Sequence, residues 1–456
     1  MRCSVPKAVL VQPPFFKLFG SHNDKVVPSL MFLGKTLENR GDEVVIVNAD
    51  SSGASWYIPW RMLYQNFGYY VEAIERGSPL FFQTVEEVMS HRPDYVVVSA
   101  GCYLATTVDF GMPWGGEKVI DLLKRYGVKI YTYGPFWDEG QFGLPSMRDE
   151  VGIVYKEGID LRLLPHGSKY DVVFSSVGCP YGCSFCLQPK YIAKRVVLSD
   201  EAIATQLHLE AHYIEDPIFD TSPYVMSLLR GRRYTVEARV DKITPQWIDI
   251  ARQCGVERVK LGVESGSKRV LDEIIRKRLD LPKVLEIASL CQRLELDAMA
   301  FYVIGFPGET KREMEETIDF ALSLENKYDV TPSLFIATPL PGTRLEEVFL
   351  KEDYYRKKLT SEEFSRMTGG MFMTGTREVP SNDLALLVKK FYGGFKKIFI
   401  YRSLVFLFRN PGLLPRLIFL YMRRDKRGAG KEFLYNLLQF RNCLKRGIHS
   451  DMTVSL

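Results

Sequence analysis

Residues 178–186 read Gly178-Cys179-Pro180-Tyr181-Gly182-Cys183-Ser184-Phe185-Cys186, which places three of the eight cysteines within eight residues, spaced C-x3-C-x2-C. Three thiolates on one short loop can bind three irons of a 4Fe–4S cluster and leave the fourth iron without a protein ligand. Because an iron with an open position can bind a small molecule, this spacing indicates chemistry at the cluster rather than electron storage alone.

Two other uses of these cysteines fit the sequence less well. A zinc site normally has a fourth Cys or His nearby, and the closest candidates, His166 and His208, lie outside the loop. Disulfide pairing would leave one cysteine over, and the loop is too short to pair well. We therefore expect Cys179, Cys183 and Cys186 to hold an iron–sulfur cluster.

From the strand directly before the cysteine loop to about residue 337, short apolar runs alternate with helix-like segments. The expected strands are 170–176, 212–216, 234–240, 258–264, 298–304 and 333–337. The expected helices are 201–209, 222–230, 245–254, 283–294 and 311–324. This alternation predicts an α/β fold with a parallel sheet. Six units are too few for a closed eight-fold barrel, so we predict a partial (β/α)6 barrel with the cysteines at the carboxyl end of its first strand.

The cysteine loop, with the aromatic Phe185 directly before its last cysteine, resembles the signature of the radical S-adenosylmethionine (SAM) superfamily. The resemblance implies that SAM chelates the fourth iron and that an electron from the reduced cluster cleaves SAM to a 5′-deoxyadenosyl radical. The strings Gly-Val-Glu-Ser-Gly-Ser at 262–267 and Ile-Gly-Phe-Pro-Gly-Glu-Thr at 304–310 are most similar to one branch of this superfamily. That branch includes coproporphyrinogen oxidase-like, methylthiotransferase-like and cobalamin-binding members.

The resemblance also implies SAM-binding residues at the ends of the predicted strands. Glu215 and Asp216 match the place where the superfamily presents backbone to the SAM ammonium group. Glu237 and Arg239 resemble the pair that contacts the aminoacyl and ribose parts of SAM. Because SAM is zwitterionic, carboxylates must meet its ammonium group and a cation must meet its carboxylate.

Two further candidate SAM-binding residues lie at the ends of the next two predicted strands. Glu264 resembles another SAM-facing position, and Gly305 resembles the segment that passes the adenine, where glycine lets the backbone approach the nucleoside. Taken singly, each charged candidate could equally form an ion pair at the barrel rim, and the glycine could equally be a turn residue.

The segment before the loop predicts a second α/β unit. Its expected strands are 7–11, 43–47, 95–99 and 129–133, and its expected helices are 28–40, 84–90 and 117–126. Glycines at the strand ends are typical of a doubly wound, Rossmann-like sheet. The order of these elements resembles the cobalamin-binding domain of cobalamin-dependent radical SAM enzymes, which implies cobalamin as a third cofactor.

This segment departs from the common pattern of cobalamin-binding domains. Many of them carry an Asp-x-His-x-x-Gly loop whose His ligates cobalt, and no such string occurs here. Many cobalamin-dependent radical SAM methylases also lack this His. A sheet that has lost the cofactor therefore stays open as an alternative.

We expect four regions: a cobalamin-binding-like domain at 1–145, a linker at 146–169, the radical SAM barrel at 170–355 and a helical, basic region at 356–456. The last region contains apolar runs at 398–408 and 413–422, which are too short to span a bilayer. It can cap the barrel, lie on a membrane surface, or contact an acidic or lipid-like substrate. No TRAM-like β-barrel tail is present, which argues against a nucleic-acid partner.

The composition bounds the cellular setting. A chain of 456 residues with 46% hydrophobic residues predicts two or three ordinary globular domains. The start of the chain shows no charged n-region followed by an apolar h-region, which argues against secretion. The remaining cysteines are scattered without a disulfide framework, which favours a reducing cytoplasm. The resemblance to the radical SAM superfamily further implies an anaerobic enzyme.

The resemblance implies an enzyme that methylates an unactivated carbon or phosphorus of a small-molecule or lipid-like substrate, with a reductant such as flavodoxin or ferredoxin. An alternative is a radical oxidation, cyclisation or carbon–carbon bond formation without methyl transfer. A non-enzymatic iron–sulfur sensor or scaffold is a third reading, and it predicts a cluster whose spectrum does not respond to SAM. The sequence does not identify the substrate or the catalytic residues beyond the cofactor sites.

Overall fold

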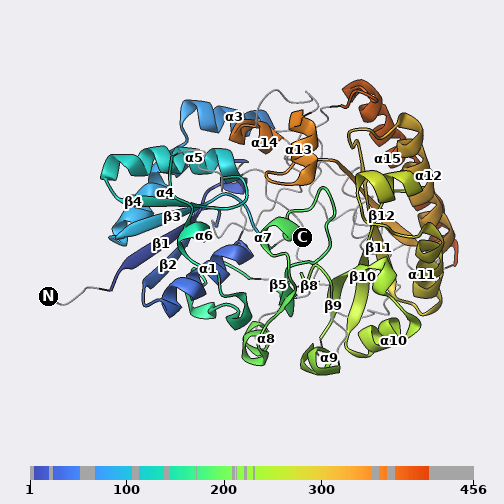
Figure 1. The fold of residues 1–456 in the computed structure, drawn as a ribbon, viewed down its shortest axis with the longest axis horizontal. Helices are drawn as coiled ribbons and strands as arrows, with labels where there is room; N and C mark the ends of the chain where they lie inside the picture. Colours follow the sequence, from blue (N-terminus) through green and yellow to red (C-terminus); the bar gives the residue numbers. More distant parts are fainter. Residues whose placement is uncertain are drawn as a thin grey trace.

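The computed structural model describes residues 5–19, 24–51, 67–104, 112–137, 143–170, 172–207, 211, 213–219, 223–229, 232–351, 359–366 and 375–409. Two parallel sheets lie side by side, and the segment with α7 (Gln188–Tyr191) lies between them (Figure 1). The predicted α/β fold class, with two α/β units and a helical C-terminal region, is confirmed.

The first sheet has the strand order β2-β1-β3-β4, and all of its pairs are parallel. Its strands are β1 (Lys7–Gln12), β2 (Glu43–Asn48), β3 (Tyr95–Ser99) and β4 (Lys129–Tyr133). Its helices are α1 (Pro28–Asn39), α3 (Phe67–Arg76), α4 (Pro79–Ser90) and α5 (Met112–Leu123). Ala8 and Leu10 belong to the core that includes α1, whereas Val9 and Val11 belong to the core that includes α3, α4 and α5. A sheet covered on both faces in this way is doubly wound, as predicted.

The second sheet has the order β12-β11-β10-β9-β8-β5, again with parallel pairs throughout. Its strands are β5 (Val172–Val173), β8 (Tyr213–Ile214), β9 (Tyr234–Arg239), β10 (Val256–Glu264), β11 (Asp297–Ile304) and β12 (Val330–Ile336). Its helices are α8 (Asp200–Gln206), α9 (Pro223–Leu229), α10 (Pro245–Gln253), α11 (Leu281–Arg293) and α12 (Lys311–Tyr328). Six parallel strands covered by α9 to α12 form the predicted partial barrel.

The strand predicted over 170–176 is wrong in its second half. After β5 the chain leaves the sheet, and β6 (Ser176–Val177) pairs antiparallel with β7 (Val196–Val197). The reason is a side chain from β8's end: the backbone N–H of Ser175 donates to Asp216 Oδ1 at 2.8 Å, so it is not available to a neighbouring strand.

Two helices of the first unit begin earlier than predicted, and α3 was not predicted. Helix α4 begins at Pro79 because the Ser78 hydroxyl accepts a hydrogen bond from the N–H of Leu80 (3.3 Å). Helix α5 includes Gly115 and Gly116, which sequence propensity disfavours. A Cβ at Gly115 would lie 2.9 Å from the Pro14 carbonyl, and one at Gly116 would lie 2.4 Å from Trp137. Close packing therefore selects glycine inside this helix.

A shared hydrophobic core joins the two units. The segment predicted as a linker contains α6 (Met147–Glu150), and its Met147, Val151 and Leu163 are buried. They belong to the same core as α1 of the first unit and as Phe174 and Leu187, which flank the cysteine loop. Burial of this shared apolar surface holds the first sheet against the cysteine loop.

The C-terminal region contacts both units. Among the described residues it contains α14 (Ser361–Arg366) and α15 (Ser381–Arg409), and α13 (Arg344–Lys351) precedes it at the end of the barrel region. Phe364 of α14 packs edge-on against Phe136 beside the first sheet, with ring centroids 4.7 Å apart. Helix α15 lies along α12 on the outside of the second sheet (Figure 1). The predicted apolar run at 413–422 lies outside the described residues.

Among the residues that the structure describes, no helix is both long enough and apolar enough to cross a membrane.

Arg402 fastens α15 to the end of α12, and its removal is expected to loosen this contact. Its Nη1 donates to the Glu325 carbonyl and to Asp329 Oδ1, both at 2.6 Å, and Glu325 is 1% exposed. Arg402→Ala removes a cation that contacts a buried carboxylate, so we expect a loss of about 2 kcal/mol in stability and faster proteolysis within α15. The exposed Lys397→Ala is the control in thermal unfolding and limited proteolysis. Equal behaviour of the two variants would contradict this role.

Candidate functional site

The cysteine loop has a fixed backbone. Gly178 adopts φ +82°, and a Cβ there would lie 2.3 Å from the Lys194 carbonyl, so only glycine fits. The N–H of Cys179 donates to the Ile192 carbonyl at 3.0 Å, and the N–H of Ser184 donates to the Ile275 carbonyl at 2.9 Å. The loop is thus held by the chain that follows it and by a distant segment of the barrel.

The three thiols face one electrostatic environment. Burial raises the pKa of Cys179, Cys183 and Cys186, that of Cys186 to about 12. Negative charge on Cys179 also raises the pKa of Cys183, and negative charge on Cys183 and Cys179 raises that of Cys186. No set of three His, Cys, Asp or Glu side chains among the described residues is compact enough for a single metal ion. Three closely spaced thiols that resist ionisation alone fit a larger, positively charged iron–sulfur core, whose binding releases their protons.

Asp216 is buried beneath the start of the loop. Its carboxylate accepts hydrogen bonds from the Ser175 N–H (2.8 Å) and the Ser176 hydroxyl (2.9 Å), and also from the Ser175 hydroxyl. Burial raises the pKa of Asp216 to about 6, although these hydrogen bonds favour the charged form. The side chain therefore anchors the chain just before Gly178, while its backbone lies at the end of β8 beside that of Glu215.

Arg239 lies at the end of β9, next to the loop. Its guanidinium carbon lies 3.8 Å from the centre of the Tyr181 ring, and its Nε donates to Asp241 at 3.0 Å. Its Nη2 also donates to the Lys277 carbonyl at 3.3 Å. The positive charge of Arg239 opposes the burial that raises the pKa of Cys179 and of Cys183. This predicted residue is therefore brought to the cysteines.

Glu264 lies within electrostatic range of Cys183 and Cys186, and it is paired with a residue that sequence reasoning missed. Its Oε1 lies 2.7 Å from Lys277 Nζ, and both residues are buried. Its backbone adopts φ +72°, an uncommon conformation for a side chain of this size. Lys277 could be noticed in the sequence only as the middle of the triplet 276–278, Arg-Lys-Arg, which looks like a solvated basic run.

Glu237 and Glu215 lie in a neighbouring polar group inside the second sheet. Glu237 accepts a hydrogen bond from the Tyr213 hydroxyl and lies 3.9 Å from Lys260 Nζ. Lys260 also lies 3.9 Å from the centre of the Tyr213 ring. Burial lowers the pKa of Lys260, while Glu237 and then Glu215 oppose that shift. Glu237 thus contacts this lysine and this tyrosine.

The backbone of Gly305 is hydrogen-bonded to a buried carboxylate, that of Glu309. It adopts φ +89°, and a Cβ there would lie 3.3 Å from Leu384 of α15. Glu309 Oε2 accepts hydrogen bonds from the N–H groups of Gly305 (2.8 Å) and Phe306 (3.0 Å). Burial raises the pKa of Glu309 to about 8. The Phe306 ring lies 6.0 Å from that of Phe185, so this loop adjoins the cysteine loop.

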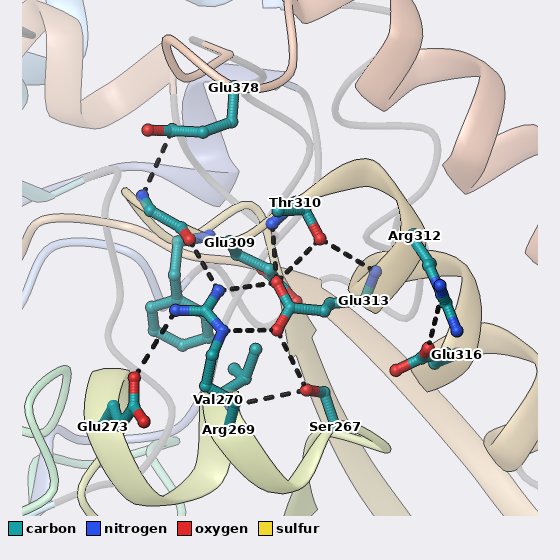
Figure 2. Close-up of polar contacts among 12 residues, drawn as sticks. Ser267, Arg269, Val270, Glu273, Glu309, Thr310, Arg312, Glu313, Glu316 and Glu378 are labelled. Atoms are coloured by element: carbon teal, nitrogen blue, oxygen red, sulfur yellow. Dashed lines mark hydrogen bonds and ion pairs between the residues drawn. The ribbon is translucent and has the colours of Figure 1, made fainter.

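An ion pair fixes the outer side of the same loop. Arg269 binds both carboxylate oxygens of Glu313 at 2.7 and 2.6 Å and donates to the Gly308 carbonyl at 2.8 Å (Figure 2). Hydrogen bonds from Arg269 hold the pKa of Glu313 well below its usual range, at about 2. Glu313 also completes a capping box with Thr310 at the start of α12.

Gln188 connects the cysteine loop to the first sheet and was also missed by the sequence analysis. Its side-chain amide donates to the Tyr103 and Leu104 carbonyls, both at 2.9 Å, in the chain that follows β3. Its backbone N–H donates to the Cys186 sulfur, which opposes the burial that raises the pKa of this thiol. One buried residue thus contacts a predicted cluster ligand and the carboxyl-end surface of the first sheet.

Glu309 is expected to make stability fall with rising pH. Because its pKa is near 8 in the folded state and near 4.5 otherwise, the folded protein holds a proton that the unfolded chain releases in this range. The stabilisation is complete below the unfolded pKa and is lost as pH rises through 8. Glu309→Gln keeps an acceptor for both N–H groups and cannot ionise. Between pH 6.5 and 8.5 the unfolding temperature of the wild type should fall more than that of the variant; parallel curves would contradict this assignment.

Comparison with known proteins agrees with the geometry. Residues 173–321 match the model of the radical SAM superfamily. An uncharacterized methyltransferase of Pyrococcus horikoshii is 30% identical over 197 residues, which are 40% of this chain and 42% of that protein. A cytidylyl-2-hydroxyethylphosphonate methyltransferase of Streptomyces wedmorensis is 26% identical over 258 residues, which are 50% and 46% of the two chains. The match thus spans less than half the length of these relatives.

A solved structure extends the likeness to the first sheet. The radical SAM methyltransferase TsrM of Kitasatospora setae, solved with cobalamin and a [4Fe–4S] cluster bound, superimposes with a TM-score of 0.56 at 14% identity. The superposition covers 86% of this chain and 91% of that one, so it includes both α/β units. The family match thus shows a radical SAM domain over residues 173–321, and the fold as a whole is similar to that of a radical SAM methyltransferase solved with cobalamin bound.

Proposed function

We propose that this protein is a cobalamin-dependent radical SAM methyltransferase acting on an unactivated carbon or phosphorus of a small-molecule or lipid-like substrate. The observation that carries the proposal is that the loops at the carboxyl ends of the strands of the two sheets contact each other. The three cysteines follow the first strand of the barrel, and Gln188 hydrogen-bonds the chain after β3 of the first sheet directly beside them. Ligands of parallel α/β sheets bind at such carboxyl ends.

Cys179, Cys183 and Cys186 would hold the cluster, and the charges around them suit a zwitterionic ligand. Arg239 presents a buried cation that can meet the SAM carboxylate. Glu264 presents a buried carboxylate for the ammonium group, and the backbone at Glu215 and Asp216 lies at the neighbouring strand end. These assignments follow the resemblance, with the contacts described above as their support.

The remaining predicted residues serve the nucleoside part in this proposal. Gly305 adopts a positive φ, and its N–H donates to Glu309; without a side chain it would let the backbone approach the adenine. Glu237 would face the ribose from its place beside Tyr213 and Lys260. The buried Phe306 and the partly buried Phe185 would exclude water from the space next to the cysteines.

Cobalamin would bind at the carboxyl ends of β1 to β4. The likeness in fold to TsrM supports this placement. A hydrogen bond also fixes the described chain after β3. The Tyr103 hydroxyl accepts a hydrogen bond from the N–H of Gly134 at 3.0 Å, which links the chain after β3 to the chain after β4. Because no Asp-x-His-x-x-Gly string occurs, the proposal assigns no histidine to the cobalt.

When bound, the reduced cluster supplies the electron that cleaves SAM, and methylcobalamin supplies the methyl group. The residues of the chain bind and orient these groups and keep out water and oxygen. A flavodoxin- or ferredoxin-like reductant would deliver the electron, and the predicted cytoplasmic, anaerobic setting fits this need.

The exposed end of α15 supports the finer proposal of a membrane or lipid-like partner. Tyr401, Leu404 and Phe408 are 66%, 61% and 89% exposed, respectively. Lys396 and Lys397 are exposed on the turn before them. Apolar and cationic side chains on one helix are typical of binding to anionic membrane surfaces.

Replacement of one predicted ligand should abolish the chemistry. After anaerobic reconstitution with iron, sulfide and cobalamin, we expect the wild type to hold about four irons and one corrin per chain. Cys183→Ala should lower bound iron and reduce SAM cleavage to the level of a control without iron, because two thiolates cannot hold the cluster. Cys291→Ala, a buried cysteine on α11, is the matched control.

The products separate the proposals. A methylated product with S-adenosylhomocysteine supports methyl transfer, whereas 5′-deoxyadenosine alone, with four irons and no corrin, favours another radical reaction. Undiminished SAM cleavage by Cys183→Ala would overturn the radical SAM assignment of this loop. A cluster whose spectrum ignores added SAM would favour a sensor or scaffold.

Membrane contact through α15 is tested with lipid vesicles. We expect the protein to co-sediment with vesicles that contain anionic phosphatidylglycerol, and Phe408→Glu to lose most of this binding by placing a negative charge in the apolar patch. Tyr126→Glu changes an exposed aromatic residue beside the first sheet and is the control. Equal binding of both variants would contradict a role for α15.

A further inference from the structure

We propose that the buried ion pair Lys277–Glu264 sets the reduction potential of the cluster held by Cys179, Cys183 and Cys186, with Lys277 raising the potential and Glu264 lowering it. The inference deepens the proposed function and rests on it, since it requires the cluster. It assigns Lys277, which the resemblance did not single out, as a positioning and tuning residue of the site.

The pair is buried and tightly enclosed. The side chains of Lys277 and Glu264 are only 6% and 9% exposed, and their charged atoms lie 2.7 Å apart. A Cβ at Gly262 would lie 2.5 Å from Lys277 Nζ and 2.7 Å from Glu264 Oε1. The pair therefore occupies the space that any other residue at 262 would fill.

An unusual backbone delivers the lysine. Arg276 and Arg278 both adopt left-handed conformations, with φ +63° and +53°, and both are exposed, whereas Lys277 between them is buried. The N–H of Lys277 donates to the Leu271 carbonyl at 2.9 Å. The neighbouring Ile275 carbonyl accepts the N–H of Ser184, which lies between Cys183 and Cys186. A backbone hydrogen bond thus joins the segment that carries Lys277 to the cysteine loop.

A second contact places the pair beside the cluster loop. Arg239 Nη2 donates to the Lys277 carbonyl at 3.3 Å, and the guanidinium carbon of Arg239 lies 3.8 Å from the centre of the Tyr181 ring, which lies between Cys179 and Cys183 in the sequence. The pair therefore forms a fixed dipole beside the cluster loop, with both charges within electrostatic range of Cys183.

Stability alone does not explain this arrangement. A buried ion pair is often no better for stability than apolar residues of the same size, and left-handed backbone at non-glycine residues carries a further cost. Reduction of an iron–sulfur cluster adds one negative charge, and nearby charges and solvent exposure set its potential. A buried cation close to the cysteines favours the reduced state, and a buried carboxylate opposes it.

The test measures cluster potentials in reconstituted full-length protein without SAM, by dithionite titration followed by electron paramagnetic resonance. At the wild-type midpoint, Lys277→Met should lower the ratio of reduced to oxidised cluster at least tenfold, which for one electron corresponds to about 59 mV. Glu264→Gln should raise this ratio, and the double variant should return toward the wild type. Lys277→Arg should retain the potential. Arg276→Met, which removes an exposed cation one residue away, should leave it unchanged.

Opposite shifts that cancel in the double variant cannot come from structural damage alone. Shifts of Lys277→Met and Glu264→Gln in the same direction, or no shift with full iron content, would overturn the inference. Failure of Lys277→Met to bind a cluster that Arg276→Met binds would also overturn it, because the lysine would then serve assembly only. A wild type without any cluster would overturn the proposed function itself.

Discussion

Three cysteine thiols lie in one partly buried loop, and binding of the proposed cluster would require all three to ionise together. Burial raises the pKa of each thiol, and each anion opposes the next. Two cations from separate segments of the barrel, Arg239 and Lys277, partly offset this rise in the pKa of Cys179 and Cys183. A cationic iron–sulfur core would supply the rest of the compensation.

Backbone amides at the loop ends are held by buried carboxylates rather than by neighbouring strands. Asp216 binds the chain before the cysteines, and Glu309 binds the amides of Gly305 and Phe306. In the first unit, Asp50 accepts the N–H groups of Phe15 and Lys17 at 2.8 and 2.9 Å in the same way. Burial raises the pKa of all three carboxyl groups, so the fold gives up some stability at higher pH to keep these loops in one conformation.

The contact between the two units fixes the space between their carboxyl-end surfaces. Apolar residues of 146–169 pack with both α1 and the residues that flank the cysteine loop, so the units share a core. Gln188 adds hydrogen bonds between the loop and the chain after β3. Helix α14 packs on the first unit and α15 on the second, so the C-terminal region bridges them from the outside. If the two surfaces bind cofactors as proposed, a constant separation between them would suit a reaction that passes a group from one to the other.

The sequence by itself determined the cysteine trio, the alternation of strands and helices and the two-sided cover of the first sheet, because spacing and apolar periodicity are local properties. It also placed Arg239 and Glu264 at strand ends, where parallel topology brings them to the cysteines. Only the tertiary structure decided that the chain leaves the barrel after β5, because Asp216, distant in sequence, takes the Ser175 amide. Likewise, Lys277 and Gln188 look like ordinary surface residues in the sequence, and long-range packing alone buries them beside the site.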